Sequence, residues 1–190
     1  STARLMTDAG LTITSQGMTA NGLVKSVTSM AINAGTGAIS QSTSIGVLWV
    51  TSAGMDVRSG GLVSQGLVKS RDLMVVNAGS GAVTQGATGT MVTETSNLSV
   101  SCNGMVADGV VQSPLSMTIA AGAGSMRQTT ASGMMTTNST LDVSATGMTA
   151  NGLVQSNVSM TIDAGAAVIR QGSAGQLSVV SGSLSARADD

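Results

Sequence analysis

A tandem repeat of about 43 residues fills this chain and constrains its fold more than any other feature. Four copies follow one another at intervals of 44, 43 and 43 residues, beginning at Leu11, Met55, Leu98 and Leu141. A methionine and a glutamine recur with the same spacing, at Met30, Met74, Met117 and Met160 and at Gln41, Gln85, Gln128 and Gln171. A fixed period of this length indicates a stacked or radial repeat architecture, because one unit cannot bury its apolar face alone.

The period predicts a single repeat domain over residues 1–190. Its repeats span 11–54, 55–97, 98–140 and 141–183, with partial repeats at 1–10 and 184–190.

The composition limits what can fill the interior of such a domain. The chain has no Phe, Tyr or His and only one Trp, but it has 13 Met. Most globular cores depend on aromatic rings for buried area, so an interior of Val, Leu, Ile, Ala and Met favours thin layers. Only 9% of the residues are charged and the net charge is −1, which excludes an electrostatic nucleic-acid binder.

Short alternating segments predict strands in every repeat. Leu11-Thr-Ile, Met30-Ala-Ile and Leu48-Trp-Val each alternate apolar and polar residues in the first repeat, and the later repeats have counterparts. This period of two is typical of half-buried β-strands.

Glycine recurs at three fixed offsets, which predicts a corner at the same place in each unit. The first two registers are Gly17, Gly61, Gly104 and Gly147, then Gly22, Gly66, Gly109 and Gly152. The third is Gly35, Gly79, Gly122 and Gly165. Asn21 and Asp108 precede glycines of the second register, and Asn-Gly and Asp-Gly favour turns with positive φ.

The predicted fold is therefore all-β, a parallel β-solenoid with two coils in each repeat. Four repeats give about eight coils and, at the usual strand spacing, a rod roughly 40 Å long. The methionine column is expected inside, and Ser26, Ser70, Ser113 and Ser156 are expected to stack into ladders. The alternative is a four-bladed β-propeller, because about 43 residues also make one blade; the lack of large aromatic residues disfavours it.

The two ends of the sequence suggest self-assembly. Leu184-Ser-Ala lies 43 residues after Leu141, like the first strand of a fifth repeat, and Met6-Thr-Asp-Ala-Gly is similar to the segment beginning at Met160. Neither end has an amphipathic cap, although solenoids normally need one to cover an open strand edge. The hypothesis is head-to-tail stacking into a filament. Its alternatives are termini that fold over the ends, or a fragment of a longer protein.

Five residues are the interface candidates: Met6, Asp8, Leu184, Ser185 and Trp49. Trp49 breaks the repeat pattern, and it is interpreted as an interface anchor, with a core plug as the alternative.

No pattern in the sequence indicates an enzyme, a cofactor, a metal site or a small-molecule substrate. There is no His, and the lone Cys102 is interpreted as a small buried hydrophobe. Asp56 and Arg58 lie on one face of a strand and predict an exposed ion pair. No run of 18 apolar residues is present, so no membrane span is expected. Ice binding would need a Thr-x-Thr column, and Thr12 and Thr14 have no counterpart in later repeats.

The short strands with Asn-Gly and Ala-Gly corners and many Ser and Thr resemble the β-solenoid shafts of bacterial surface adhesins and autotransporter passengers. The Met-Thr-Ile-x-Ala-Gly segments also resemble the β-helical spikes of phage tails and type VI secretion needles. The first resemblance implies a self-assembling structural subunit of an extracellular or cell-surface fibre, whose partner is another copy of the chain. The second implies a trimeric spike or tail-fibre component. A carbohydrate-binding β-helix is the third hypothesis.

Overall fold

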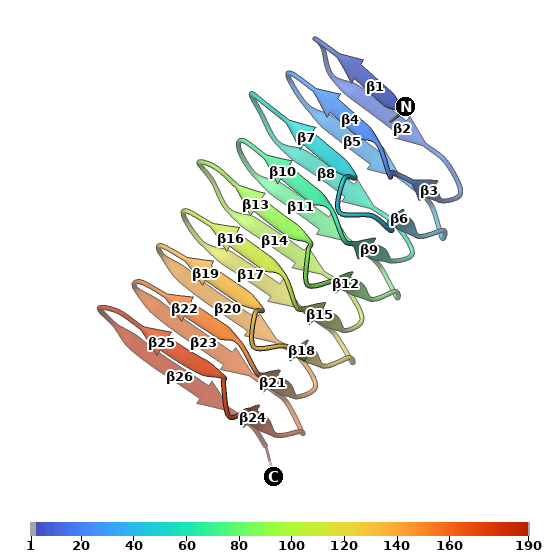
Figure 1. Cartoon of the computed structure of the whole chain (residues 1–190). Helices are drawn as coiled ribbons and strands as arrows, with labels where there is room; N and C mark the ends of the chain where they lie inside the picture. Colours follow the sequence, from blue (N-terminus) through green and yellow to red (C-terminus); the bar gives the residue numbers. More distant parts are fainter. Residues whose placement is uncertain (1–2, 190) are drawn as a thin grey trace.

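The computed structural model describes residues 3–189, and in it the chain winds as an all-β solenoid through three parallel sheets (Figure 1). Each coil contributes strands in a constant order to sheets that we name A, B and C. Each strand pairs in parallel with the equivalent strand of the next coil. The two termini consequently lie at opposite ends of a rod (Figure 1).

The strands are short. Sheet A consists of β1 (Arg4–Thr7), β4 (Leu23–Ser26), β7 (Val47–Val50), β10 (Leu67–Ser70), β13 (Thr90–Thr93), β16 (Val110–Ser113), β19 (Met134–Thr137), β22 (Leu153–Ser156) and β25 (Gln176–Val179). Sheet B consists of β2 (Leu11–Thr14), β5 (Met30–Asn33), β8 (Met55–Arg58), β11 (Met74–Asn77), β14 (Leu98–Ser101), β17 (Met117–Ala120), β20 (Thr140–Ser144), β23 (Ser159–Asp163) and β26 (Ser183–Arg187). Sheet C consists of β3 (Met18–Thr19), β6 (Ile39–Gln41), β9 (Leu62–Ser64), β12 (Val83–Gln85), β15 (Met105–Ala107), β18 (Met126–Gln128), β21 (Met148–Ala150) and β24 (Ile169–Gln171).

The predicted β-solenoid with two coils in each repeat is confirmed. Sheets A and B have nine strands each and sheet C has eight. The extra level beyond the eight expected coils comes from the segments outside the four repeats, which supply β1 and β26. The alternative of a β-propeller is wrong, because propeller blades are antiparallel sheets around a central channel and these three sheets are parallel and run the length of the rod.

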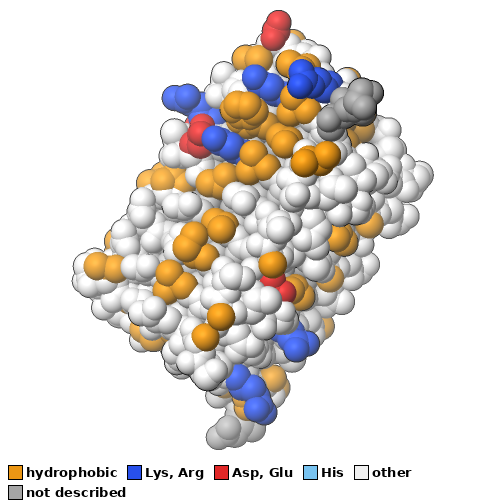
Figure 2. All heavy atoms as spheres, viewed as in Figure 1, with side chains coloured by type: hydrophobic (Ala, Val, Ile, Leu, Met, Phe, Trp, Pro, Cys, Tyr) orange, Lys and Arg blue, Asp and Glu red, His pale blue; other side chains and the backbone are white. Residues whose placement is uncertain are grey.

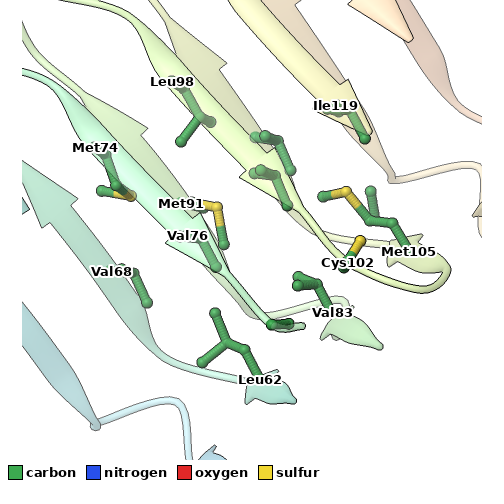
Figure 3. Close-up of a cluster of buried hydrophobic side chains, with 14 of the residues drawn as sticks. Leu62, Val68, Met74, Val76, Val83, Met91, Leu98, Cys102, Met105 and Ile119 are labelled. Carbon is green, nitrogen blue, oxygen red and sulfur yellow. The ribbon is translucent and has the colours of Figure 1, made fainter. Parts of the chain in front are cut away.

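The interior is a stack of aliphatic layers. The predicted methionine column is buried, with Met55, Leu98 and Leu141 between its members in the intervening coils. Figure 3 shows how the three sheets meet there: Val68 comes from sheet A, Met74 from sheet B and Leu62 from sheet C. Complete burial of a side chain of this size is worth about 1.5–3 kcal/mol, so a narrow rod gains enough apolar burial without aromatic rings.

The four serines are buried, and they do not stack directly on one another. They occupy every second coil, with Val50 between Ser26 and Ser70 but Thr93 and Thr137 in the later intervening coils, so the predicted ladder is a mixed Ser/Thr column that Val50 interrupts. Each hydroxyl lies instead within hydrogen-bond distance of two backbone carbonyls at the corner between sheets A and B. Ser26 Oγ is 2.6 Å from both the Ala9 and the Ser29 oxygens. The serines therefore join neighbouring coils at the corner, where regular strand pairing stops.

Two glycine registers are required for different reasons. Gly35, Gly79, Gly122 and Gly165 have φ between +54° and +57°, the left-handed region that favours glycine. The second register does not have positive φ, so that prediction was wrong. In that register a Cβ would lie much closer than van der Waals contact to a carbonyl oxygen of the preceding coil, for example the Gly89 oxygen at Gly109. Close approach of the two coils, not backbone angle, requires glycine there.

The first coil begins in a different register from the one predicted by the similarity of the Met6 segment to the Met160 segment. Met6 lies on β1 in sheet A and pairs with Lys25, whereas Met160 lies on β23 in sheet B. Ala9-Gly10-Leu11 corresponds in structure to Ala53-Gly54-Met55, so Met6 occupies the position of Trp49, which also pairs with Lys25. A shared Ala-Gly pair made the two segments look alike, because such pairs occur at more than one corner of the coil.

Candidate functional site

The two end faces of the rod are where its interior is uncovered. Leu5 of β1 and Leu184 of β26 stand in inward-facing columns, yet they are 47% and 46% exposed. Their partners one coil further in, Val24 and Met160, are buried. Between residues 3 and 189 no further element packs over either face. Residues 3–189 thus present an exposed leucine of an inward-facing column at each end of the rod.

The end faces also present open strand edges. β1, β2 and β3 are the last strands at the N-terminal face, and β24, β25 and β26 are the last at the C-terminal face. Strands at a sheet edge carry unpaired N–H and C=O groups, which can pair with another strand. Sheet C is one strand shorter than its neighbours because no strand follows β24 in it, so the C-terminal face has a step. At the N-terminal face a hollow of about 250 Å³ lies between β1, β3 and β4.

Four of the five candidate interface residues lie at these faces. Met6 lies on the outer side of β1 and Asp8 in the turn that follows, and both are exposed. Leu184 and Ser185 lie on β26, where all five residues are exposed. These four residues come from both ends of the chain and are not brought together within one molecule.

Trp49 lies away from the end faces. It points outward from β7, so it is not a core plug, and it pairs with Lys25 on one side and Lys69 on the other. Their ammonium nitrogens are 4.6 Å and 5.4 Å from the centre of the ring. Cation–π contacts of this kind stabilise a protein surface. Because both lysines stand next to the ring, they compete with any ligand for its faces.

The charged side chains of the second repeat form separate pairs. Arg58 Nη2 lies 3.0 Å from Asp56 Oδ2 with both side chains exposed, which confirms the predicted surface ion pair. Lys69 Nζ lies 2.5 Å from Glu94 Oε1 in the next coil, and Asp72 accepts a hydrogen bond from Thr95. Exposed pairs contribute about 0–1 kcal/mol, so these contacts are part of an ordinary solvated surface.

The outer surface carries little charge. Figure 2 shows a face on which polar uncharged atoms and scattered hydrophobic side chains predominate, and its few Lys, Arg, Asp and Glu side chains lie mostly toward the ends. Within residues 3–189, no group of three or more acidic, His or Cys side chains could hold a metal ion. In the same range there is no helix with the length and apolarity to cross a bilayer.

Cys102 is buried near the corner between sheets B and C, as the sequence predicted. Burial raises the pKa of the thiol above its ordinary value, and hydrogen bonds with the backbone of Val83 and Gly104 oppose that shift in part. A thiol with a raised pKa is a poor nucleophile at neutral pH.

Sequence reasoning missed one feature of the N-terminal face. The residue before each strand of sheet A is glycine at eight corners, namely Gly22, Gly46, Gly66, Gly89, Gly109, Gly133, Gly152 and Gly175. At the first corner the residue before β1 is Ala3. The predicted second glycine register contains only four of these eight glycines, because the repeats were aligned in units of two coils. The other four glycines are visible in the same alignment.

Comparisons of this chain with protein-family models, with curated proteins and with solved structures found no match. The functional argument consequently rests on the geometry of the rod and its end faces.

Proposed function

We propose that this protein is a structural β-solenoid whose copies stack head to tail into a fibre outside the cell. The observation that carries the proposal is the matched exposure of the interior at the two faces, at Leu5 and Leu184. Burying both in one joint removes apolar surface from water. It also pairs open strand edges that would otherwise remain a liability. The extracellular or cell-surface location rests on the resemblance to adhesin shafts.

The register within the rod supports one arrangement of the joint. If the pattern of pairing continues, β25 pairs with β1 of the next copy and β26 pairs with its β2. Leu177 then packs on Leu5, and Leu184 packs on Leu11, which is only half-buried in the single chain. Met6 pairs with Ser178, and Ser185 pairs with Thr12. Two of the three sheets continue through such a joint, while sheet C has a gap one strand wide between β24 and β3.

Charge does not oppose this joint. In the extended register Arg4 faces Gln176 and Arg187 faces Thr14, so no like charges are placed opposite one another. The contact joins two different surfaces and does not close on itself, so repetition produces an open filament.

Negative-stain electron microscopy across a concentration series tests the proposal. The protein should form uniform unbranched filaments at high concentration and single rods when dilute. Leu184→Asp should weaken assembly by at least about a hundredfold, because an unpaired carboxylate buried at the joint costs about 3 kcal/mol or more.

The matched control is Leu115→Asp. Leu115 is 47% exposed, almost the same as Leu184, but it lies on the side of the rod far from both faces. This variant should assemble like the unmodified protein. Equal loss in both variants, or single rods at every concentration, would contradict end-to-end stacking. A discrete trimer would favour the spike hypothesis instead.

A further inference from the structure

We infer that the methyl group of Ala3 limits how tightly the N-terminal face accepts a second copy of this chain. The inference rests on the proposed head-to-tail function and identifies one atom that restrains the joint. It comes from the corner between sheets C and A. The residue immediately before each of the nine strands of sheet A is glycine in eight cases and Ala3 in the remaining one.

Every glycine at this corner lies against the coil before it. A Cβ at Gly46 would be 2.6 Å from the Ala20 oxygen, and a Cβ at Gly133 would be 2.7 Å from the Ala107 oxygen. At Gly22, Gly66, Gly109, Gly152 and Gly175 the distance to a carbonyl oxygen of the preceding coil would be shorter still. The colliding atoms are backbone, so no rotation of a side chain relieves the overlap.

The same corner carries a hydrogen bond that fixes how close the coils come. The first residue of each later sheet A strand donates its N–H to the carbonyl of the corner residue one coil earlier. Leu67 N lies 2.8 Å from the Gly46 oxygen, and Leu23 N lies 3.0 Å from the Ala3 oxygen. In a continuous joint, Arg4 N of the next copy would donate to the Gly175 oxygen in the same way.

Ala3 is tolerated in the single chain because no preceding coil brings a carbonyl oxygen against its Cβ. It lines the hollow beside β1 and β3, and it is exposed. When a second copy docks in register, Ala3 holds the place that Gly46, Gly89 and Gly133 hold in their repeats, where a Cβ would overlap the carbonyl oxygen at the end of the sheet C strand one coil earlier. In the joint that carbonyl belongs to Gln171, at the end of β24. The joint must open at this corner or Ala3 must move away from it. Either adjustment weakens the Arg4 hydrogen bond and keeps assembly reversible.

The test is Ala3→Gly, with association measured by sedimentation velocity over a concentration series. Removing the methyl should lower the concentration at half-assembly about tenfold or more, which corresponds to about 1.4 kcal/mol. Ala3→Val should raise that concentration. Ala9→Gly is the matched control, because it makes the same change at the exposed corner between sheets A and B, and it should leave the concentration unchanged.

The outcomes separate this inference from the proposed function. If the unmodified chain assembles and Ala3→Gly has the same half-assembly concentration, the inference is wrong and head-to-tail stacking stands. An equal gain in Ala9→Gly would also overturn it, because chain flexibility would then explain the effect. If neither the unmodified chain nor Ala3→Gly assembles at any concentration, both fail.

Discussion

Glycine is required in this rod for two separable reasons, and two single substitutions can measure them. At Gly79 the φ of +56° demands glycine, but a Cβ would have room, since the nearest atom is the Ser59 oxygen at 3.7 Å. Gly79→Ala should therefore cost only about 1–2 kcal/mol in the free energy of unfolding.

At Gly109 the backbone angle is ordinary, but a Cβ would overlap the Gly89 oxygen. Gly109→Ala should cost about 4 kcal/mol, at the high end for point substitutions, because two coils must separate. Urea unfolding of both variants gives the comparison. A larger loss in Gly79→Ala than in Gly109→Ala would mean that close approach is not what this corner requires.

Buried glutamine oxygens offer a stabilising substitution. Gln41 Oε1 accepts a hydrogen bond of 2.7 Å from Ser64, whereas the buried oxygens of Gln85 and Gln128 have no partner within the described residues. Their neighbours at the position of Ser64 are Ala107 and Ala150. Ala107→Ser should raise the free energy of unfolding by about 1 kcal/mol by supplying the missing donor.

Thermal or urea unfolding checks this prediction, with Ser64→Ala as the reverse change beside Gln41. Ser64→Ala should lower stability by about 1–2 kcal/mol, because it leaves Gln41 Oε1 unpaired. A destabilised Ala107→Ser would show that the interior has no room for the hydroxyl.

Cys102 should make stability fall with pH above about 9. Burial raises the pKa of the thiol above its ordinary value of 9.0, so the folded chain holds the proton more tightly than the unfolded chain does. The contribution is fully present below the unfolded pKa and is lost as pH rises through the folded pKa. The free energy of unfolding between pH 8 and 10.5 should decline more steeply for the natural chain than for Cys102→Ala. Parallel curves would contradict this.

The corner between sheets B and C shows how one element is tuned from repeat to repeat. Asn33, Asn77 and Asp163 each accept a hydrogen bond from the glycine N–H two residues later, at 2.9–3.0 Å. Ala120 holds the equivalent position before Gly122 and has no such group. Ala120→Asn should raise the free energy of unfolding by about 0.5–1.5 kcal/mol. A change of zero or below would indicate that these side chains bond equally well to water.

The strands of sheet B and every second strand of sheet A could be predicted, because segments such as Leu11-Thr-Ile and Leu48-Trp-Val are long enough to alternate. Sheet C was only partly recognised, since β3 has two residues and β9 has three, too few for a period of two to stand out. The register of Met6 was misjudged because Ala-Gly pairs occur at all three corners of the coil, so an Ala-Gly pair alone does not identify the corner.

The whole molecule follows from the period of the sequence, but its end faces do not. A period of 43 residues predicted the parallel sheets and the buried methionine column. It did not reveal that sheet C has one strand fewer than its neighbours, or that Ala3 stands where glycine recurs. The sequence contains the glycines of this corner, but only the paired coils show which carbonyl a Cβ there would meet.

The most direct test of head-to-tail stacking is disulfide trapping between two variants in a Cys102→Ala background. In the proposed joint, Thr12 of one copy lies beside Ser185 of another at the strand spacing of about 4.8 Å, within the range that a disulfide spans. Mixed and oxidised Thr12→Cys and Ser185→Cys chains should yield the mixed dimer in high proportion. Thr161→Cys, one strand further from the face, should not link to Thr12→Cys. Equal yields from the two mixtures would contradict the joint.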